Sequence, residues 1–152
     1  MDNTPLVWAA CNGHERVVEI LLRRDDINPE KAGNYGQTPL WNAARNGHVG
    51  VIKMLLERDE VNADKPNNYS QGPLWFAAFN GYEGVVKILL ERGEVNPDKP
   101  DNDRRTPLWG AAWNDVGIVK ILLDQDEVNP DSPHTDGRTP LWSAFRMGMK
   151  EW

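Results

Sequence analysis

The sequence has little cysteine, because Cys11 is the only one among its 152 residues. A single thiol excludes an internal disulfide framework and is typical of a protein in a reducing compartment. No apolar run approaches the roughly 20 residues that span a bilayer. The first residues, MDNTPLVW, lack the basic segment and the apolar stretch of a secretory signal. We therefore expect an intracellular protein with no membrane partner, in the cytoplasm, with the nucleus as an open alternative.

Positive charge is scarce as well. The chain has 17 lysine and arginine residues against 23 aspartate and glutamate residues, which gives a formal net charge of −6. Binding to a phosphate backbone without regard to sequence needs clustered positive charge. Here the densest basic pairs are only Arg23-Arg24 and Arg104-Arg105. This balance argues against that mode of binding, and we expect no nucleic-acid partner.

The residue combinations that carry catalysis or hold a metal are missing. The three histidines do not recur with a serine, a cysteine or paired carboxylates in a pattern that could form a catalytic centre. Acidic stretches such as residues 124–127 lack the Asp/Asn alternation and the glycine of a calcium loop, so we interpret them as solvated. We expect no catalytic residue, no metal and no cofactor, and hence no enzyme.

What the sequence does have is a repeat. The tripeptide Thr-Pro-Leu, once with glycine in place of threonine, returns at intervals of 34, 34, 34 and 33 residues. Such a period indicates a solenoid, in which each unit buries its apolar face only by stacking on its neighbours. The five copies of the tripeptide begin at Thr4, Thr38, Gly72, Thr106 and Thr139.

Each unit predicts the same local structure. A first helix from Pro39 to about Asn46 follows a threonine that can cap it and has proline in its first turn. Gly47 marks a turn, and apolar residues at helical spacing predict a second helix from about Val49 to Arg58. The stretch DEVNADKPNNYSQ that follows is rich in residues that favour turns. It predicts a long projecting loop.

The unit resembles the ankyrin repeat. The stretch TPLWNAARNGHVGVIKMLLERDEVN follows the pattern T-P-L-H-x-A-A-x-x-G-H-x-x-V-V-x-x-L-L-x-x-G-A-D-V-N. The form of the repeat that contains ERxEVNPDKPDN is similar to the ankyrin arrays of large fungal multidomain proteins. The resemblance implies an all-α ankyrin-repeat solenoid of helix-turn-helix units with projecting β-hairpin or loop fingers. It divides one domain, residues 1–152, into repeats at about 4–37, 38–71, 72–105 and 106–138 and a partial repeat at 139–152.

The chain departs from the family pattern in three ways. Tryptophan stands where the family has histidine, which leaves two readings open. Either residues of the same faces fill the gaps between successive indoles and tryptophan merely replaces histidine at the base of the fingers, or part of the ladder of indoles stays open and binds a ligand with apolar or planar groups. Ser70 and Arg104 stand where Gly36 and Gly137 keep the finger turn, so the resemblance predicts a different shape for those two turns. The fourth repeat is one residue shorter between its helices, which predicts a tighter junction.

Ankyrin arrays are generally protein-interaction modules, so the resemblance implies a non-catalytic scaffold that binds another protein on its concave face and finger loops. Two positions vary between the repeats, one on the first helix and one in the finger turn, and in the family these positions contact partners. The predicted partner-binding residues, with the tryptophans, are Tyr35, Trp41, Arg45, Tyr69, Trp75, Phe79, Arg104, Arg105, Trp109, Trp113, Arg138, Trp142 and Arg146.

Among these residues, Phe79 and Trp113 with Arg104 and Arg105 beside them predict an apolar centre with a basic edge, which suits a hydrophobic and acidic partner. Two alternatives stay open at this stage. A groove lined by tryptophan would suit a small hydrophobic molecule. A self-assembling or engineered array would instead associate end to end, because the terminal repeats lack the polar faces that cap a stable solenoid.

Overall fold

The computed structural model describes residues 3–113, 115–140 and 142. Within these residues the chain forms four helix pairs and one short 3-10 helix, η1, at Asn34–Gly36. The pairs are α1 (Pro5–Cys11) with α2 (Glu15–Leu22), α3 (Pro39–Asn46) with α4 (Val49–Leu56), α5 (Pro73–Phe79) with α6 (Glu83–Leu90), and α7 (Pro107–Ala111) with α8 (Val116–Leu123).

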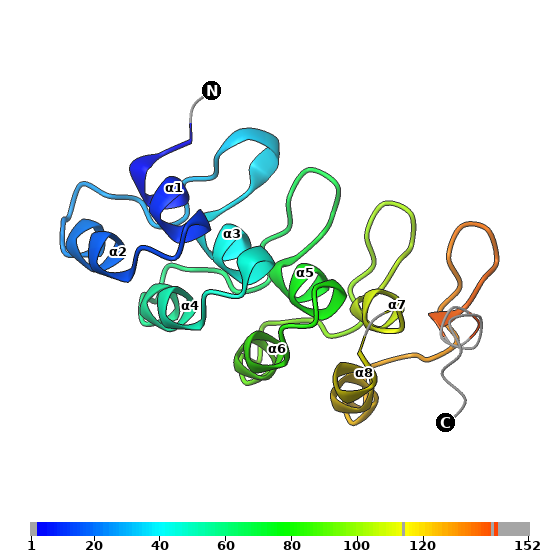
Figure 1. Ribbon diagram of the computed structural model, residues 1–152. Coiled ribbons are helices and arrows are strands. Elements are labelled where there is room, and N and C mark those ends of the chain that lie inside the picture. The colour runs from blue at the N-terminus through cyan, green and yellow to red at the C-terminus, as the bar shows by residue number, and fades with distance from the viewer. Residues whose placement is uncertain (1–2, 114, 141, 143–152) are drawn as a thin grey trace.

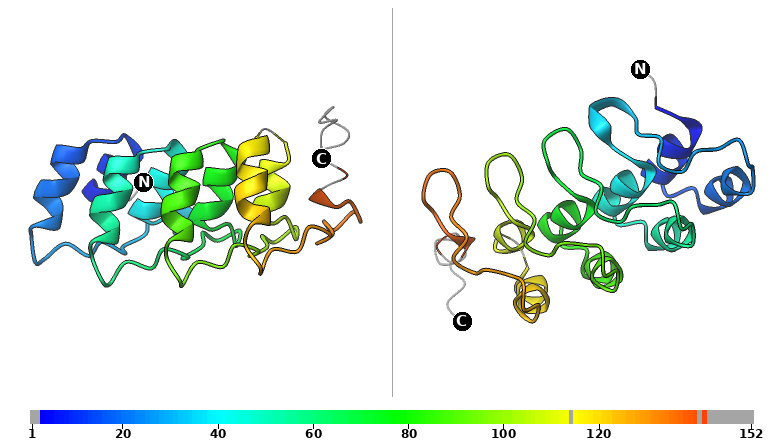
Figure 2. Two further views of the ribbon diagram at one scale, coloured as in Figure 1. Left: turned by 90° about the horizontal axis from the view of Figure 1, so that it is seen from below. Right: turned by 180° about the vertical axis from the view of Figure 1, so that it is seen from behind.

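The helices lie in two rows (Figure 1). The first helices of the repeats, α1, α3, α5 and α7, form one row, and the second helices, α2, α4, α6 and α8, form the other. Four long loops, each leading from one repeat towards the next, leave the array along one edge and project beyond the first row (Figure 2). The described residues therefore form the predicted all-α ankyrin solenoid.

The sequence predicted the first helix of the second repeat with the bounds that α3 has. The predicted second helix was two residues too long, because α4 ends at Leu56 rather than Arg58. There the amide of Arg58 donates to the carbonyl of Leu55 at 3.1 Å, which tightens the last turn. Thr38 caps α3 through its hydroxyl, which accepts from the amide of Trp41 at 3.0 Å, whereas Gly72 has no side chain to cap α5.

The connection inside the fourth repeat differs from the others, but it is not the tighter junction that the sequence predicted. In the first three repeats Gly13, Gly47 and Gly81 hold positive φ angles of 69°, 75° and 80° between the two helices. The fourth repeat has Asp115 at the start of α8, and its carboxylate accepts from the amide of Ile118 at 3.0 Å. The missing residue shortens the first helix and not the connection, because α7 has 5 residues where α3 has 8. α7 ends at Ala111 and α8 begins at Val116, whereas α3 ends at Asn46 and α4 begins at Val49.

The apolar core runs between the two rows. The alanines of the first helices, such as Ala43 and Ala44, are fully buried and small enough for close helix packing. Opposite them, α4, α6 and α8 each bury two Val or Ile residues and one leucine, which is Leu55, Leu89 or Leu122 at 0% exposure, whereas α2 buries only Val18. Burial of this continuous core across neighbouring repeats is what a solenoid needs for stability.

No strand forms within residues 3–113, 115–140 and 142, so the predicted β-hairpins are not found there. Each long loop is instead closed at its tip by a backbone hydrogen bond across five residues, such as Asn67 to Gln71 at 3.0 Å. The amide of Asn68 also donates to the carbonyl of Tyr35 in the preceding tip at 2.8 Å, and the later tips are joined in the same way. We call residues 33–37, 67–71, 101–105 and 134–138 the tips.

The second, third and fourth tips share one left-handed residue, so the predicted difference in shape is not found among them. The first tip does differ, because both Tyr35 and Gly36 are left-handed, with φ angles of 62° and 77°. Ser70, Arg104 and Gly137 have φ angles of 61°, 66° and 82°. Each of these residues donates its amide to a carbonyl three residues earlier, so the same turn forms with or without glycine. Of the partial repeat at 139–152, only residues 139, 140 and 142 are among the described residues.

Candidate functional site

Trp41 and Trp75 lie in the interior, with exposed fractions of 1% and 5%. The indole Nε1 of Trp41 donates to the carbonyl of Gln71 at 2.9 Å, and that of Trp75 donates to the carbonyl of Arg105 at 3.1 Å. Each indole thus ties a first helix to the tip of its own repeat. The prediction that Trp41 and Trp75 contact a partner is wrong, because neither ring has surface to offer.

Phe76 fills the space between these two indoles. Its ring centroid lies 4.6 Å from that of Trp41 and 4.8 Å from that of Trp75, both in edge-on geometry, which is favourable for aromatic pairs. The guanidinium of Arg45 lies 5.6 Å from the ring centroids of both Trp41 and Phe76. The sequence analysis missed Phe76, although it is the only aromatic residue that directly follows one of the four repeat tryptophans.

The Arg105 side chain is engaged in contacts within the chain and does not form the predicted basic edge. Its guanidinium lies 5.6 Å from the Trp75 ring and 5.5 Å from the Trp109 ring. The same group pairs with Asp101 at 2.8 Å and with Asp103 at 2.7 Å. Because the Asp101 side chain is only 1% exposed, Arg105 neutralises a buried carboxylate. Its charge is therefore not free for a partner.

Trp109 differs from the two buried tryptophans. Its ring is partly exposed and stacks on His134, with centroids 5.7 Å apart. Its Nε1 is buried but has no hydrogen-bond partner in the described part of the chain, whereas Trp41 and Trp75 both donate to a tip. The fourth tip is therefore less firmly tied to its first helix than the second and third tips.

Two aromatic residues on neighbouring repeats remain open to solvent in the variable first-helix position. Phe79 is half-buried and stacks on Trp75 with ring centroids 5.2 Å apart. Trp113 is 39% exposed and lies 5.4 Å from the ring of Trp109. In the first two repeats Cys11 and Arg45 occupy this position, so the fold itself does not require an aromatic residue there.

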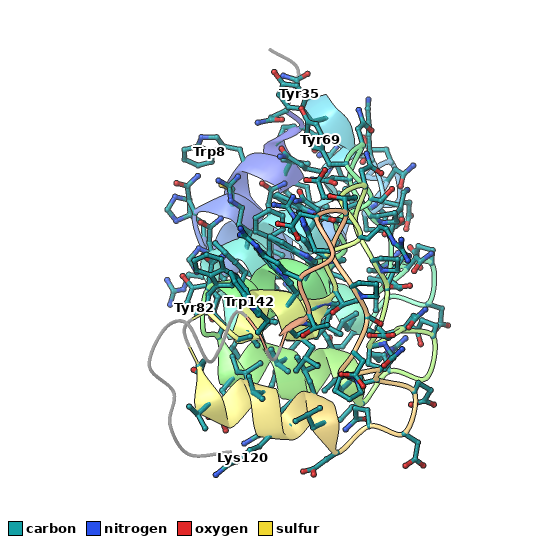
Figure 3. All side chains as sticks on the ribbon, turned by 90° about the vertical axis from the view of Figure 1, so that its right-hand side faces the viewer. Trp8, Tyr35, Tyr69, Tyr82, Lys120 and Trp142 are labelled. Carbon is teal, nitrogen blue, oxygen red and sulfur yellow. The ribbon has the colours of Figure 1, made fainter. Side chains whose placement is uncertain are left out.

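Tyr35 and Tyr69 form a second aromatic pair, on the first two tips. Their rings are stacked with centroids 6.4 Å apart, although the residues are 61% and 52% exposed. Figure 3 shows both side chains at the tip end of the molecule, at the opposite end from Lys120 on α8. The structure thus brings together two predicted residues from tips that are distant in the sequence.

The remaining predicted residues lie at the later tips or beyond them. Arg104 is exposed and forms no ion pair with a described residue. Arg138 pairs with Asp136 at 3.3 Å, and its guanidinium lies 4.5 Å from the ring of Trp142, which is 42% exposed. Arg146 lies outside the described residues.

The bases of the long loops hold a polar network that the sequence analysis treated only as solvated. Lys65 pairs with Glu30 at 2.9 Å and Lys99 pairs with Asp64 at 2.8 Å, each across two repeats. Burial raises the pKa of the Asp98 carboxyl, and hydrogen bonds from the Asn129 backbone and the Ser132 hydroxyl oppose this effect. The signal for this network was present in the sequence as the repeated DKP motif.

Three cavities lie among the second helices and the loop bases rather than beside the tryptophans. Their volumes are about 540, 310 and 470 Å³. Charged side chains such as Asp64, Glu94 and Arg58 line them, and no tryptophan does. None of these three cavities is the tryptophan-lined groove that a small hydrophobic ligand would need.

Within the part of the chain that the structure describes, no three His, Cys, Asp or Glu side chains are grouped so that they could hold a metal ion. No helix in that part is long and apolar enough to cross a membrane.

A family model for ankyrin repeats (3 copies) matches residues 1–67 and 74–151. The chain therefore belongs to the ankyrin-repeat family. The chain has no match among the curated proteins. Ankyrin repeats are generally protein-interaction modules, and the family is typically non-catalytic.

Proposed function

We propose that this ankyrin-repeat chain binds a segment of another protein through its inner surface, which we define as Arg45, Phe79, Trp113, Tyr35, Tyr69 and Arg104. The observation that carries the proposal is that Trp113 is 39% exposed and Phe79 only half-buried, at a position where other repeats have cysteine or arginine. Aromatic and arginine residues are enriched among the side chains that dominate binding energies at protein interfaces.

The inner surface also suits a partner with acidic and apolar side chains. Arg45 and Arg104 are exposed and form no ion pair with a described residue, so their charge is available. Arginine guanidinium groups favour carboxylates, which they can bind in a bidentate manner. A rigid stack that presents these side chains loses little conformational entropy on binding.

Truncation of the two aromatic residues tests this proposal. The chain and its variants would be compared for capture of a partner from an extract, and then for affinity to the purified partner. We expect Phe79→Ala and Trp113→Ala each to weaken binding by about 1 kcal/mol or more per folded molecule. Leu123→Ala is the matched control, because Leu123 on α8 is also 39% exposed but lies outside the inner surface.

Equal losses of affinity in Trp113→Ala and Leu123→Ala would contradict the proposal. So would unchanged affinity in both aromatic variants. Thermal unfolding of each variant shows whether a change in binding reflects a change in the folded fraction.

We also propose that the first repeat mediates self-association. Val17 on α2 is 43% exposed, whereas its equivalents Val51 and Val85 are 0% and 1% exposed because each packs against a preceding repeat. Ile20 on the same helix is 62% exposed. Sedimentation at increasing concentration should show association that Ile20→Lys abolishes. A wild-type chain that stays monomeric at every concentration would contradict this proposal.

A further inference from the structure

A lysine at the base of each middle loop clamps its repeat to the preceding one. The ammonium of Lys65 pairs with the Glu30 carboxylate at 2.9 Å and donates to the Glu30 carbonyl at 3.3 Å. The ammonium of Lys99 binds the carboxylate and the carbonyl of Asp64, both at 2.8 Å. Each lysine therefore fixes both the side chain and the backbone of the loop before it.

An arginine forms a second clamp at the same two junctions. The Nη1 atom of Arg58 donates to the carbonyl of Leu22 at 3.1 Å, which joins the second repeat to the end of α2. Arg92 donates in the same way to the carbonyl of Leu56 at 3.4 Å. These bonds satisfy carbonyls that the end of a helix otherwise leaves without a partner.

The fourth repeat has lost both clamps. Ser132 stands in place of the lysine, and its hydroxyl reaches only the Asp98 carboxylate at 3.4 Å. The other oxygen of Asp98 is buried without a hydrogen-bond partner among the described residues. Gln125 stands in place of the arginine and donates within its own helix, to the carbonyl of Ile121.

In place of the clamps, apolar packing and one backbone hydrogen bond hold the fourth repeat on the third. Leu108, Ile118 and Leu122 are buried there as their equivalents are in the second and third repeats, and the tips remain joined by a backbone bond from Thr135 to Asp103. An array of repeats opens where the interface between neighbours is weakest. The missing clamps place that point between the third and fourth repeats.

We infer that the stack opens at this junction, with residues 106–138 separating from the third repeat as one unit. Phe79 and Trp113 lie on opposite sides of the junction, so opening would divide the inner surface. That consequence rests on the proposed function, whereas the opening itself does not.

Amide hydrogen exchange of the full chain, followed by mass spectrometry, tests the opening directly and needs no partner. We expect α7 and α8 to exchange faster than α3 to α6 as a single unit. Because a repeat near one end of an array can fray for that reason alone, the decisive variant is Gln125→Arg with Ser132→Lys. This double variant restores both clamps, and it should slow exchange in α7 and α8 by about fivefold or more.

Two matched variants complete the experiment. Arg92→Gln with Lys99→Ser removes the same clamps from the third repeat, and should move the point of opening to the junction between the second and third repeats. Lys31→Ser removes the equivalent lysine of the first repeat, whose ammonium forms no ion pair with a described residue, and should leave exchange in α3 to α8 unchanged.

The inference is overturned if α7 and α8 exchange as slowly as α5 and α6. It is also overturned if their exchange is fast but the double variant Gln125→Arg with Ser132→Lys does not slow it, since the cause is then the end of the array. Because exchange is measured on the chain alone, either result leaves the proposed binding function to its own test.

Discussion

The guanidinium of Arg105 lies 5.6 Å from the ring centroid of Trp75, and the Trp75 indole donates to the carbonyl of the same arginine at 3.1 Å. The two residues thus hold each other through both a side chain and the backbone. The guanidinium forms an ion pair with the buried carboxylate of Asp101. This arrangement makes Arg105 part of the folded core of the tips, although it is a charged residue in a loop.

Loss of the Arg105 side chain should therefore reduce stability. We expect Arg105→Ala to lower the free energy of unfolding by about 1.5–3 kcal/mol, because it removes charge-assisted hydrogen bonds to a buried carboxylate. The neighbouring Arg104→Ala is the control and should change stability by less than about 0.5 kcal/mol. Urea unfolding of both variants measures the difference, and equal effects would contradict the assigned role of Arg105.

A threonine in place of Gly72 should stabilise the chain. Gly72 has φ and ψ of −80° and 170°, close to the values of −72° and 165° at the capping Thr38. A Cβ atom at Gly72 would meet only the Asp64 carboxylate, at an ordinary contact distance of 3.5 Å. We expect Gly72→Thr to raise the free energy of unfolding by about 0.5–1 kcal/mol, through the new cap and a less flexible unfolded chain.

Chemical denaturation measures this gain, and Thr38→Gly provides the reverse change at an equivalent position. A loss of stability in Gly72→Thr would mean that the added hydroxyl disturbs the pair of Asp64 with Lys99 instead of capping α5.

The Asp98 carboxyl should make stability depend on pH. Burial raises the pKa of this group, so the folded state holds the proton more tightly than the unfolded state does. Ionisation of the buried carboxyl therefore begins to destabilise the folded state as pH rises past the ordinary aspartate pKa of about 3.9. This loss of stability is complete above the raised pKa of Asp98 in the folded state. Glu94 and Glu127 line the same cavity, and no cationic side chain does.

Asp98→Asn removes this titration. The free energy of unfolding of this variant, minus that of the unsubstituted chain, should be larger at pH 7 than at pH 3. The variant is therefore relatively more stable at pH 7, as urea unfolding at both pH values would measure. Asp64→Asn is the control. Because the Asp64 carboxylate pairs with Lys99, its replacement should lower the stability of the chain at pH 7. A pH-independent difference for Asp98→Asn would contradict the effect of burial.

The repeat period and the helix signals were enough to predict the fold. Helical spacing, the threonine caps and Gly47 predicted α3 with its observed ends, because all of these signals act within a few residues. The place of Trp41 could not be predicted in the same way. Its indole bonds a carbonyl 30 residues later, and the distance between a helix and a distant tip depends on the packing of the whole repeat.

The roles of the two neighbouring arginines show the same limit within the candidate site. Arg104 and Arg105 are alike in sequence, and both were predicted to face a partner. The left-handed conformation of Arg104, with φ of 66°, sets which of the two side chains meets Asp101. The missing clamps of the fourth repeat, by contrast, were readable in the change from ERGEVNPDKP to DQDEVNPDSP, once the contacts of Lys99 and Arg92 were known.

The left-handed turn at the tips has a consequence for how the sequence of this array can change. A residue with a side chain is less stable than glycine in this conformation, by about 1 kcal/mol, yet the third tip has Arg104 where the fourth has Gly137. Glycine would therefore be the better residue for folding at Arg104. The backbone keeps its shape with either residue, so the outward chemistry of a tip can be exchanged one residue at a time while the stack beneath it stays the same.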